Sequence, residues 1–167
     1  MKMKKINYLI LLVVVLVGIS CEPTYVKTYS WAYPVAGDWT VKTYVDGEVF
    51  GKAREIKSYN SAFGKDSIWI DDIVSYSPYA SFWDFQAKIA VNMGAKTFGN
   101  GTNSVLSAVP DYGIGVKVMN GKIIGNDSIY FEIQFGDDTD VNGDPQPYGT
   151  TYQIKGHRTT SYEEYMR

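Results

Sequence analysis

The stretch that decides the fold is GDWTVKTYVDGEVF, residues 37–50. Four alternate positions carry residues that suit one face of a strand, namely Trp39, Val41, Thr43 and Val45. This two-residue period is typical of a half-buried β-strand. Asp46-Gly47 follows directly, and this dipeptide tolerates the positive φ angles of a tight hairpin turn. The stretch therefore predicts a first strand that turns back and pairs with residues 49–59.

The same period recurs along the rest of the chain. Further short strands are predicted at residues 67–71, 85–93, 105–109, 115–119, 129–135 and 151–159. Asn120-Gly121 is the strongest hairpin signal and predicts a turn. About eight short strands joined by tight turns predict an all-β fold, an antiparallel up-and-down β-barrel. A two-sheet sandwich is the alternative architecture.

The two ends of this series carry residues that a closed barrel would bring together. Gly37 and Trp39 begin the first strand, and Arg158 shares one face of the last strand with Tyr152 and Ile154. A guanidinium that lies on an indole gains about 0.5–2 kcal/mol. This pairing resembles the lipocalin and wider calycin pattern. We therefore expect the Arg158 guanidinium within about 6 Å of the Trp39 ring.

The N-terminus has the order of a secretory signal. Lysines at positions 2, 4 and 5 precede an apolar run at 6–17, and small residues then lead to Cys21, the only cysteine. The apolar run is shorter than the roughly 20 residues of a membrane span. The Val17–Cys21 stretch resembles a lipobox. We predict a signal peptide at 1–20, a lipidated tether at 21–36 and a barrel domain at 37–167, held at the outer membrane of the cell envelope.

The charge balance limits the class of partner. The chain has 16 Lys and Arg, three of them in the leader, against 18 Asp and Glu. The mature chain thus carries 13 against 18, a net charge of −5 without a basic cluster. This balance argues against nucleic acid. The expected partners are a membrane, through the lipid anchor, and a small hydrophobic ligand.

Several segments together resemble a known family. These are the lipobox, TYSWAYPVAGDWTVKTYVDGE at 28–48, SIWIDD at 67–72 and YQIKGHRTTSY at 152–162. They are similar to Bacteroidetes lipoproteins described as lipid-binding putative hydrolases with a calycin-like β-barrel. The resemblance implies this fold and a lipid-like ligand, and it carries over no catalytic residues. His157 is the only histidine, and neither a G-x-S-x-G nor an H-E-x-x-H motif is present.

The apolar face of the strands supplies the candidate ligand contacts. The predicted barrel-interior positions are Val41, Phe85, Ile89, Val91, Met93, Phe131, Ile133 and Phe135. The first functional hypothesis is binding of a small apolar or amphipathic ligand in or at the mouth of the barrel. The alternative is a surface interaction or glycan-accessory module, suggested by the outward aromatics Tyr44, Trp69 and Tyr130. A closed and filled barrel would favour that module. A hydrolase is the third hypothesis.

One loop has the start of a calcium-binding pattern. Asp138, Asp140 and Asn142 alternate and are followed by Gly143, as in D-x-[DN]-x-[DN]-G. The position where a closing Glu is expected holds Gly149. The loop therefore predicts either a calcium site or a solvated acidic turn. No other cofactor is expected.

Overall fold

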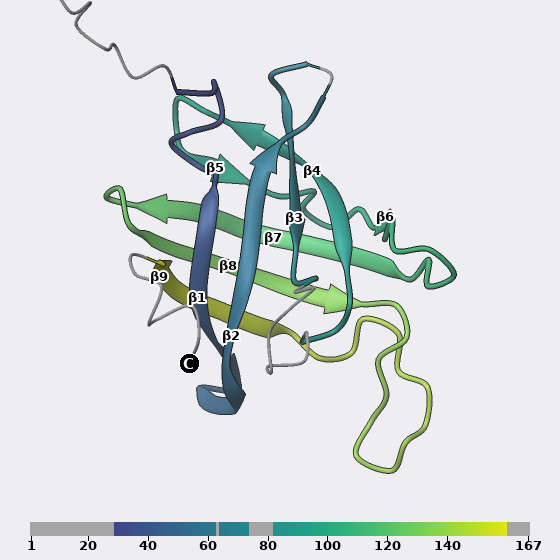
Figure 1. Ribbon diagram of the computed structural model, residues 1–167. Coiled ribbons are helices and arrows are strands. Elements are labelled where there is room, and N and C mark those ends of the chain that lie inside the picture. Colours follow the sequence, from purple (N-terminus) through teal and green to yellow (C-terminus); the bar gives the residue numbers. More distant parts are fainter. Residues whose placement is uncertain (1–28, 63, 74–81, 160–167) are drawn as a thin grey trace, which may run out of the picture.

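A computed structural model of the protein describes residues 29–62, 64–73 and 82–159 (Figure 1). The strands are β1 (Gly37–Val45), β2 (Glu48–Asn60), β3 (Ser67–Asp71), β4 (Gln86–Asn92), β5 (Thr97–Phe98), β6 (Val105–Leu106), β7 (Gly115–Ile124), β8 (Ser128–Phe135) and β9 (Tyr152–Arg158). The predicted signal peptide and Cys21 lie outside the described residues. Within the described part of the chain, no helix is long and apolar enough to cross a membrane.

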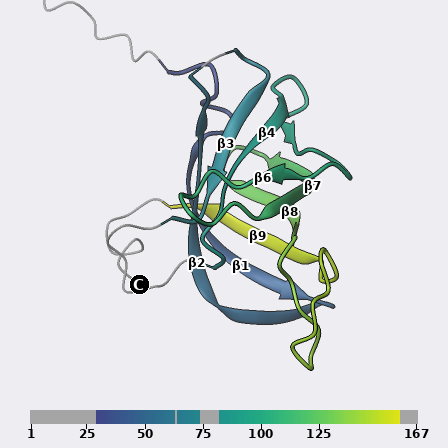
Figure 2. The ribbon, with the colours of Figure 1, turned by 90° about the vertical axis from the view of Figure 1, so that its right-hand side faces the viewer.

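The strands form a closed antiparallel barrel. The order is β5-β4-β3-β2-β1-β9-β8-β7, and an additional pairing of β5 with β7 closes the ring of eight strands. The short β6 pairs with β7 as a ninth strand. Figure 2 shows the strands wrapping around a common interior. The predicted all-β barrel is therefore confirmed, and the sandwich is excluded because a sandwich leaves two separate sheets.

The first and last strands meet through Trp39 and Arg158, which are register partners between β1 and β9. The Arg158 guanidinium carbon lies 4.4 Å from the centroid of the Trp39 ring, inside the expected range. The guanidinium also donates to the carbonyl oxygens of Ala36, at 2.5 Å, and Asn126, at 3.3 Å. A Cβ on Gly37 would lie only 2.2 Å from Arg158 Nη1. Glycine at position 37 therefore leaves the space that the guanidinium occupies.

The segment before β1 is part of the folded domain. Residues 31–35 form a turn, and the side chains of Ala32 and Val35 are fully buried. The Trp39 indole N–H donates to Ser58 Oγ at 2.8 Å, and Ser58 Oγ donates to the Val35 carbonyl at 2.7 Å. The tether predicted at 21–36 is thus too long. The absence of a clear period at 29–36 reflects a turn that covers the Trp39 end of the barrel.

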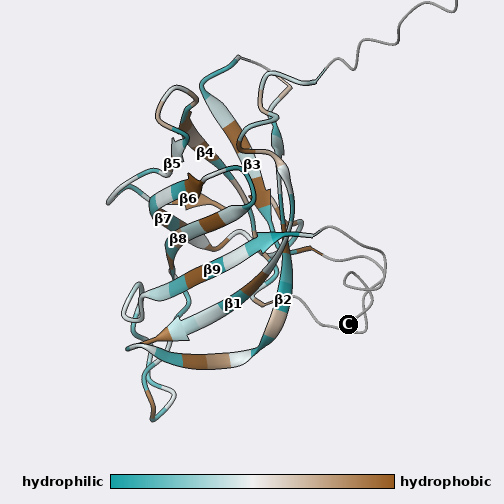
Figure 3. Cartoon of the chain, turned by 90° about the vertical axis from the view of Figure 1, so that its left-hand side faces the viewer, coloured by the Kyte–Doolittle hydropathy of each residue, from teal (hydrophilic) through white to brown (hydrophobic). Residues whose placement is uncertain are grey.

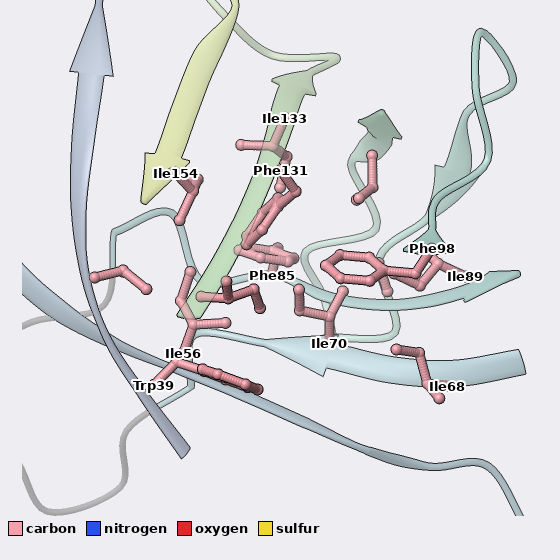
Figure 4. Close-up of a cluster of buried hydrophobic side chains, with 14 of the residues drawn as sticks. Trp39, Ile56, Ile68, Ile70, Phe85, Ile89, Phe98, Phe131, Ile133 and Ile154 are labelled. Atoms are coloured by element: carbon pink, nitrogen blue, oxygen red, sulfur yellow. The ribbon is translucent and has the colours of Figure 1, made fainter. Parts of the chain in front are cut away.

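The interior is filled by side chains from alternate strand positions. Figure 3 shows hydrophobic and hydrophilic residues alternating along the strands, and Figure 4 shows the large buried side chains packed together. Six of the predicted interior residues are at most 1% exposed: Val41, Phe85, Ile89, Phe131, Ile133 and Phe135. Val91 and Met93 are partly buried against this core. The predicted face is therefore the inner face, and the protein's own side chains occupy it.

The hairpin predicted at Asn120-Gly121 is wrong. Strand β7 continues through this dipeptide, and its register with β8 shifts between Met119 and Lys122. Asn120 has a φ of 53°, which the residue type tolerates, but the strand uses it for a bulge. A Cβ on Gly121 would lie 2.3 Å from Phe98 Cδ2, so this glycine permits the close approach of β5. The chain instead turns between Ile124 and Ser128.

Replacement of Arg158 tests the closure. Arg158→Ala removes the stacking on Trp39 and the bond to the Ala36 carbonyl, so the free energy of unfolding should fall by roughly 1–3 kcal/mol. Lys42→Ala is the control, because Lys42 is exposed on the adjacent strand, and its effect should stay within about 0.5 kcal/mol. Urea unfolding measures both variants. Equal effects of the two substitutions would contradict the closing role of Arg158.

Candidate functional site

One end of the barrel carries a cluster of aromatic side chains that we call the aromatic mouth. It consists of Phe50 in β2, Phe82 and Trp83 before β4, Phe135 at the end of β8 and Tyr152 at the start of β9. Arg158 ends β9, six residues after Tyr152, which corresponds to about 20 Å along a strand. The aromatic mouth therefore lies at the opposite end of β9 from the Trp39–Arg158 closure.

The rings of the aromatic mouth pack against one another in a layer whose exposure to solvent increases away from the core. Trp83 stacks on Phe135 with centroids 4.3 Å apart and planes at 2°. Phe82 packs edge-on against Tyr152 at 5.2 Å, and Phe50 lies 5.6 Å from Tyr152. Phe135 is fully buried and Tyr152 is 5% exposed, whereas Phe50 is 48% exposed. The layer thus connects the filled core with solvent through apolar ring surface.

The Asp72 carboxylate positions the segment that carries Phe82 and Trp83. Asp72 directly follows β3 and is 1% exposed. Its carboxylate accepts the backbone N–H groups of Trp83 at 2.6 Å, Asp84 at 3.3 Å and Phe85 at 2.8 Å. Burial raises the pKa of Asp72 above its ordinary value of 3.8, and the bonds to Trp83 and Phe85 offset part of that rise.

Two further aspartates hold the polar edges of the rings. Asp137 accepts the indole N–H of Trp83 at 2.9 Å and the hydroxyl of Tyr112. Asp138 is 3% exposed and accepts the Tyr152 hydroxyl at 3.2 Å. Burial and the nearby Asp138 charge raise the pKa of Tyr152 to about 12. The polar atoms are therefore fixed at the rim, and the apolar ring faces remain for packing.

The neighbouring aspartates 71 and 72 do not share one site. The Asp71 carboxylate accepts the Tyr59 hydroxyl at 2.7 Å, and that hydroxyl also accepts a hydrogen bond from Gln86 Nε2 at 2.9 Å. Burial raises the pKa of Asp71. Since Asp72 binds a different set of donors, the two carboxylates act as separate structural acceptors.

The loop of the calcium prediction uses its carboxylates internally. Asp138 accepts the N–H of Thr150 at 2.8 Å in addition to Tyr152. Asp140 accepts the N–H groups of Asn142, at 2.8 Å, and Asp144, at 3.0 Å, and these bonds lower the Asp140 pKa. The described residues contain no group of three or more His, Cys, Asp or Glu arranged to hold a metal. A calcium site at Asp138, Asp140 and Asn142 stays a prediction.

Only one of the eight residues predicted to contact a ligand lies in the aromatic mouth. Phe135 belongs to it, while the remaining predicted positions lie in the core or pack against it. Phe50, Phe82 and Trp83 were not predicted as contacts, because none lies in a strand with a clean alternation. A usable signal was the density of aromatic residues in FWDF, residues 82–85. The exposed His157 lies on β9.

Comparison with known proteins identifies a family. A family model described as "lipid-binding putative hydrolase" matches residues 24–163, which is most of the chain. The match includes every described residue, from the turn at 31–35 to the end of β9. No curated protein matches the chain.

The raised pKa of Asp72 predicts a pH dependence of stability. The unfolded chain releases this proton near pH 3.8, whereas the folded chain retains it to a higher pH. The folded state therefore binds more protons, and stability falls as the pH rises from 3.8 through the folded-state pKa. Relative to Asp72→Asn, the wild type should gain stability on acidification across this window. Urea unfolding over a pH series measures the difference.

Asp140 supplies a control of opposite sign. Its pKa is lowered, so the wild type should lose stability relative to Asp140→Asn as the pH falls through the folded-state pKa. If the stability curves of the wild type and Asp72→Asn ran parallel, the effect assigned to Asp72 would be wrong.

Proposed function

The chain belongs to the family of lipid-binding putative hydrolases, and we propose that its aromatic mouth binds the apolar part of a small amphiphile. The observation that carries this proposal is the layer formed by Phe50, Phe82 and Trp83 over the buried Phe135 and Tyr152. Phe50 is 48% exposed and Phe82 and Trp83 are partly buried, and apolar ring surface that reaches solvent at the end of a barrel is typical of a ligand or interaction site. An acyl chain laid on these rings would remove apolar surface from water, at about 25 cal/mol per Å².

The filled interior favours a surface site, as expected for an interaction module, and it leaves the mouth rather than the inside of the barrel for an apolar ligand. Eight strands leave an interior that side chains can fill or that can hold one small ligand. Here the fully buried Trp39, Phe85 and Phe131 occupy that interior. The apolar part of the ligand would therefore contact the exposed Phe50 ring and the partly buried rings of Phe82 and Trp83, and the core beneath would act as a rigid support.

The rim offers polar partners for a headgroup. Asp137 and Tyr112 lie beside the indole of Trp83 and are joined by a hydrogen bond. An amphiphile whose tail covers the rings would place its polar end near these groups. This arrangement favours a ligand with both an apolar and a hydrogen-bonding part over a pure hydrocarbon.

We also propose that the protein is held at the outer membrane through lipid on Cys21. The support is the signal-like order of residues 1–20 and the single cysteine that follows it. The chain enters the described domain at residues 29–36, which pack at the Trp39 end. The aromatic mouth lies at the other end of the barrel, so an anchor at Cys21 would leave it directed away from the attachment point.

A pair of substitutions on one hairpin tests the mouth. Phe50 is the register partner of the buried Thr43, so it faces the mouth, whereas Val49 pairs with Tyr44 on the outer face. Phe50→Ser should raise the Kd for cis-parinaric acid by roughly five- to thirtyfold, from about 1–2 kcal/mol of lost apolar contact. Val49→Ser should leave the Kd unchanged, because Val49 lies on the other face with a comparable exposed fraction. Fluorescence titration measures both.

Two results would contradict this proposal. One is a wild-type titration that never saturates, and the other is an equal effect of Phe50→Ser and Val49→Ser. Either result would favour the alternative in which the filled barrel serves as a surface interaction module.

The anchor is tested at the cysteine itself. Cys21→Ala removes the thiol to which lipid would be attached, so the variant should lose its acyl chains and leave the membrane fraction. Intact-protein mass spectrometry and fractionation after a carbonate wash measure the two effects. A variant that remains with the membrane after the wash would show that Cys21 is not the anchor.

A further inference from the structure

A groove on the outside of the barrel is separate from the aromatic mouth. Its volume is about 810 Å³, within the roughly 300–1,000 Å³ of typical ligand pockets. It crosses β4, β5, β7 and β8, and its polar lining is Asn92, Thr97, Asn120, Lys122, Tyr130 and Glu132. Phe131 and Ile133 of β8 point into the core. Tyr130 precedes Phe131 and Glu132 lies between the two, so both point outward.

The Glu132 carboxylate is held in place at the groove surface. The Tyr130 hydroxyl donates to Glu132 Oε1 at 2.6 Å, and Asn120 Nδ2 donates to Glu132 Oε2 at 2.8 Å. The bulge in β7 brings Asn120 within reach, since its φ of 53° lies at the register shift. A carboxylate oxygen can accept two hydrogen bonds, so each Glu132 oxygen retains capacity for a ligand donor. The groove thus presents a fixed acceptor pair whose orientation is set before a ligand arrives.

One buried donor beside the groove has no partner. Asn100 lies between the groove residues Gly99 and Gly101, and its Oδ1 accepts the N–H of Ala90 at 3.2 Å. Its Nδ2 is buried and makes no hydrogen bond with the described residues. Buried polar atoms are almost always paired, so an unpaired one calls for a partner.

The composition of the groove excludes several kinds of ligand. An acyl chain would bury the Glu132 and Asn120 groups without new hydrogen bonds, which is costly. Among the described lining residues Lys122 is the one cationic side chain, and the Glu132 carboxylate lies in the same groove, so a polyanion is disfavoured. A peptide strand is disfavoured here, because β7 and β8 pair on both sides and the β4 edge at Val91 and Asn92 already pairs with β5.

We propose that the outer groove binds a neutral glycan. Sugar hydroxyls donate and accept hydrogen bonds, so adjacent hydroxyls can satisfy the Glu132 carboxylate, the Asn120 amide and the Thr97 hydroxyl together. The Ala90 methyl group supplies apolar surface for the sugar rings, together with the part of the Tyr130 ring that Lys122 Nζ, 5.2 Å from the ring centroid, leaves open. This site is independent of the mouth, because none of the residues that line the groove belongs to the aromatic mouth.

The test uses the full chain in vesicles of phosphatidylethanolamine and phosphatidylglycerol, which carry no sugar headgroups. Isothermal titration with maltohexaose, cellohexaose, xylohexaose and mannohexaose should give saturable binding of at least one. Glu132→Gln should raise the Kd about tenfold, since it removes a charged acceptor. Ala90→Tyr should abolish binding, because Ala90 is exposed in the groove and the added ring would obstruct it beside Tyr130 and Glu132.

Matched controls separate this site from the mouth. Lys88→Tyr adds the same ring on the same exposed face of β4 but outside the groove, so glycan affinity should be unchanged. Phe50→Ser should also leave glycan affinity unchanged, while Ala90→Tyr should leave the affinity for cis-parinaric acid unchanged. The proposal is overturned if none of the four oligosaccharides binds saturably, or if Ala90→Tyr and Lys88→Tyr have the same effect.

Discussion

The stacking of the Arg158 guanidinium on Trp39 is the contact on which the closed barrel depends. It joins the first strand to the last, and a charge in this half-buried position needs partners because desolvation is costly. The indole face and the Ala36 carbonyl provide them, and Gly37 provides the space. The turn before β1 therefore belongs to the same unit as the closing pair.

Local sequence patterns predicted the strands well, because the inward face must be apolar at every second residue. The pairing of the first strand with the last was also predictable, since it brings Gly37, Trp39 and Arg158 together. The prediction of a hairpin at Asn120-Gly121 was wrong because the same dipeptide suits two backbone structures. Asn120-Gly121 suits a hairpin turn, but here the same positive φ makes a bulge that accommodates Phe98. Ala32 and Val35 show no period because they belong to a single turn, although both are fully buried.

The candidate site was harder to predict than the fold. Alternation identifies which side chains face inward but does not show whether they leave a cavity, so Phe131 and Ile133 were predicted as ligand contacts and form core instead. The mouth depends on Phe82 and Trp83, which lie in a loop without a period. Their position follows from the buried Asp72 carboxylate, which accepts the loop's N–H groups from a distant part of the sequence. Such a long-range hydrogen bond leaves no pattern in the neighbouring residues.

The same alternation that builds the barrel also separates two kinds of surface chemistry. Each strand sends one set of side chains to the core and the other to the wall, so β8 contributes Phe135 to the mouth and Glu132 to the groove. Apolar binding is available only where the inner face reaches solvent, which is at the end of the barrel. Directional hydrogen bonding is available on the wall, where a bulge turns Asn120 towards Glu132. A small closed barrel with a filled interior can in this way carry two separate binding surfaces, because neither surface requires a central cavity.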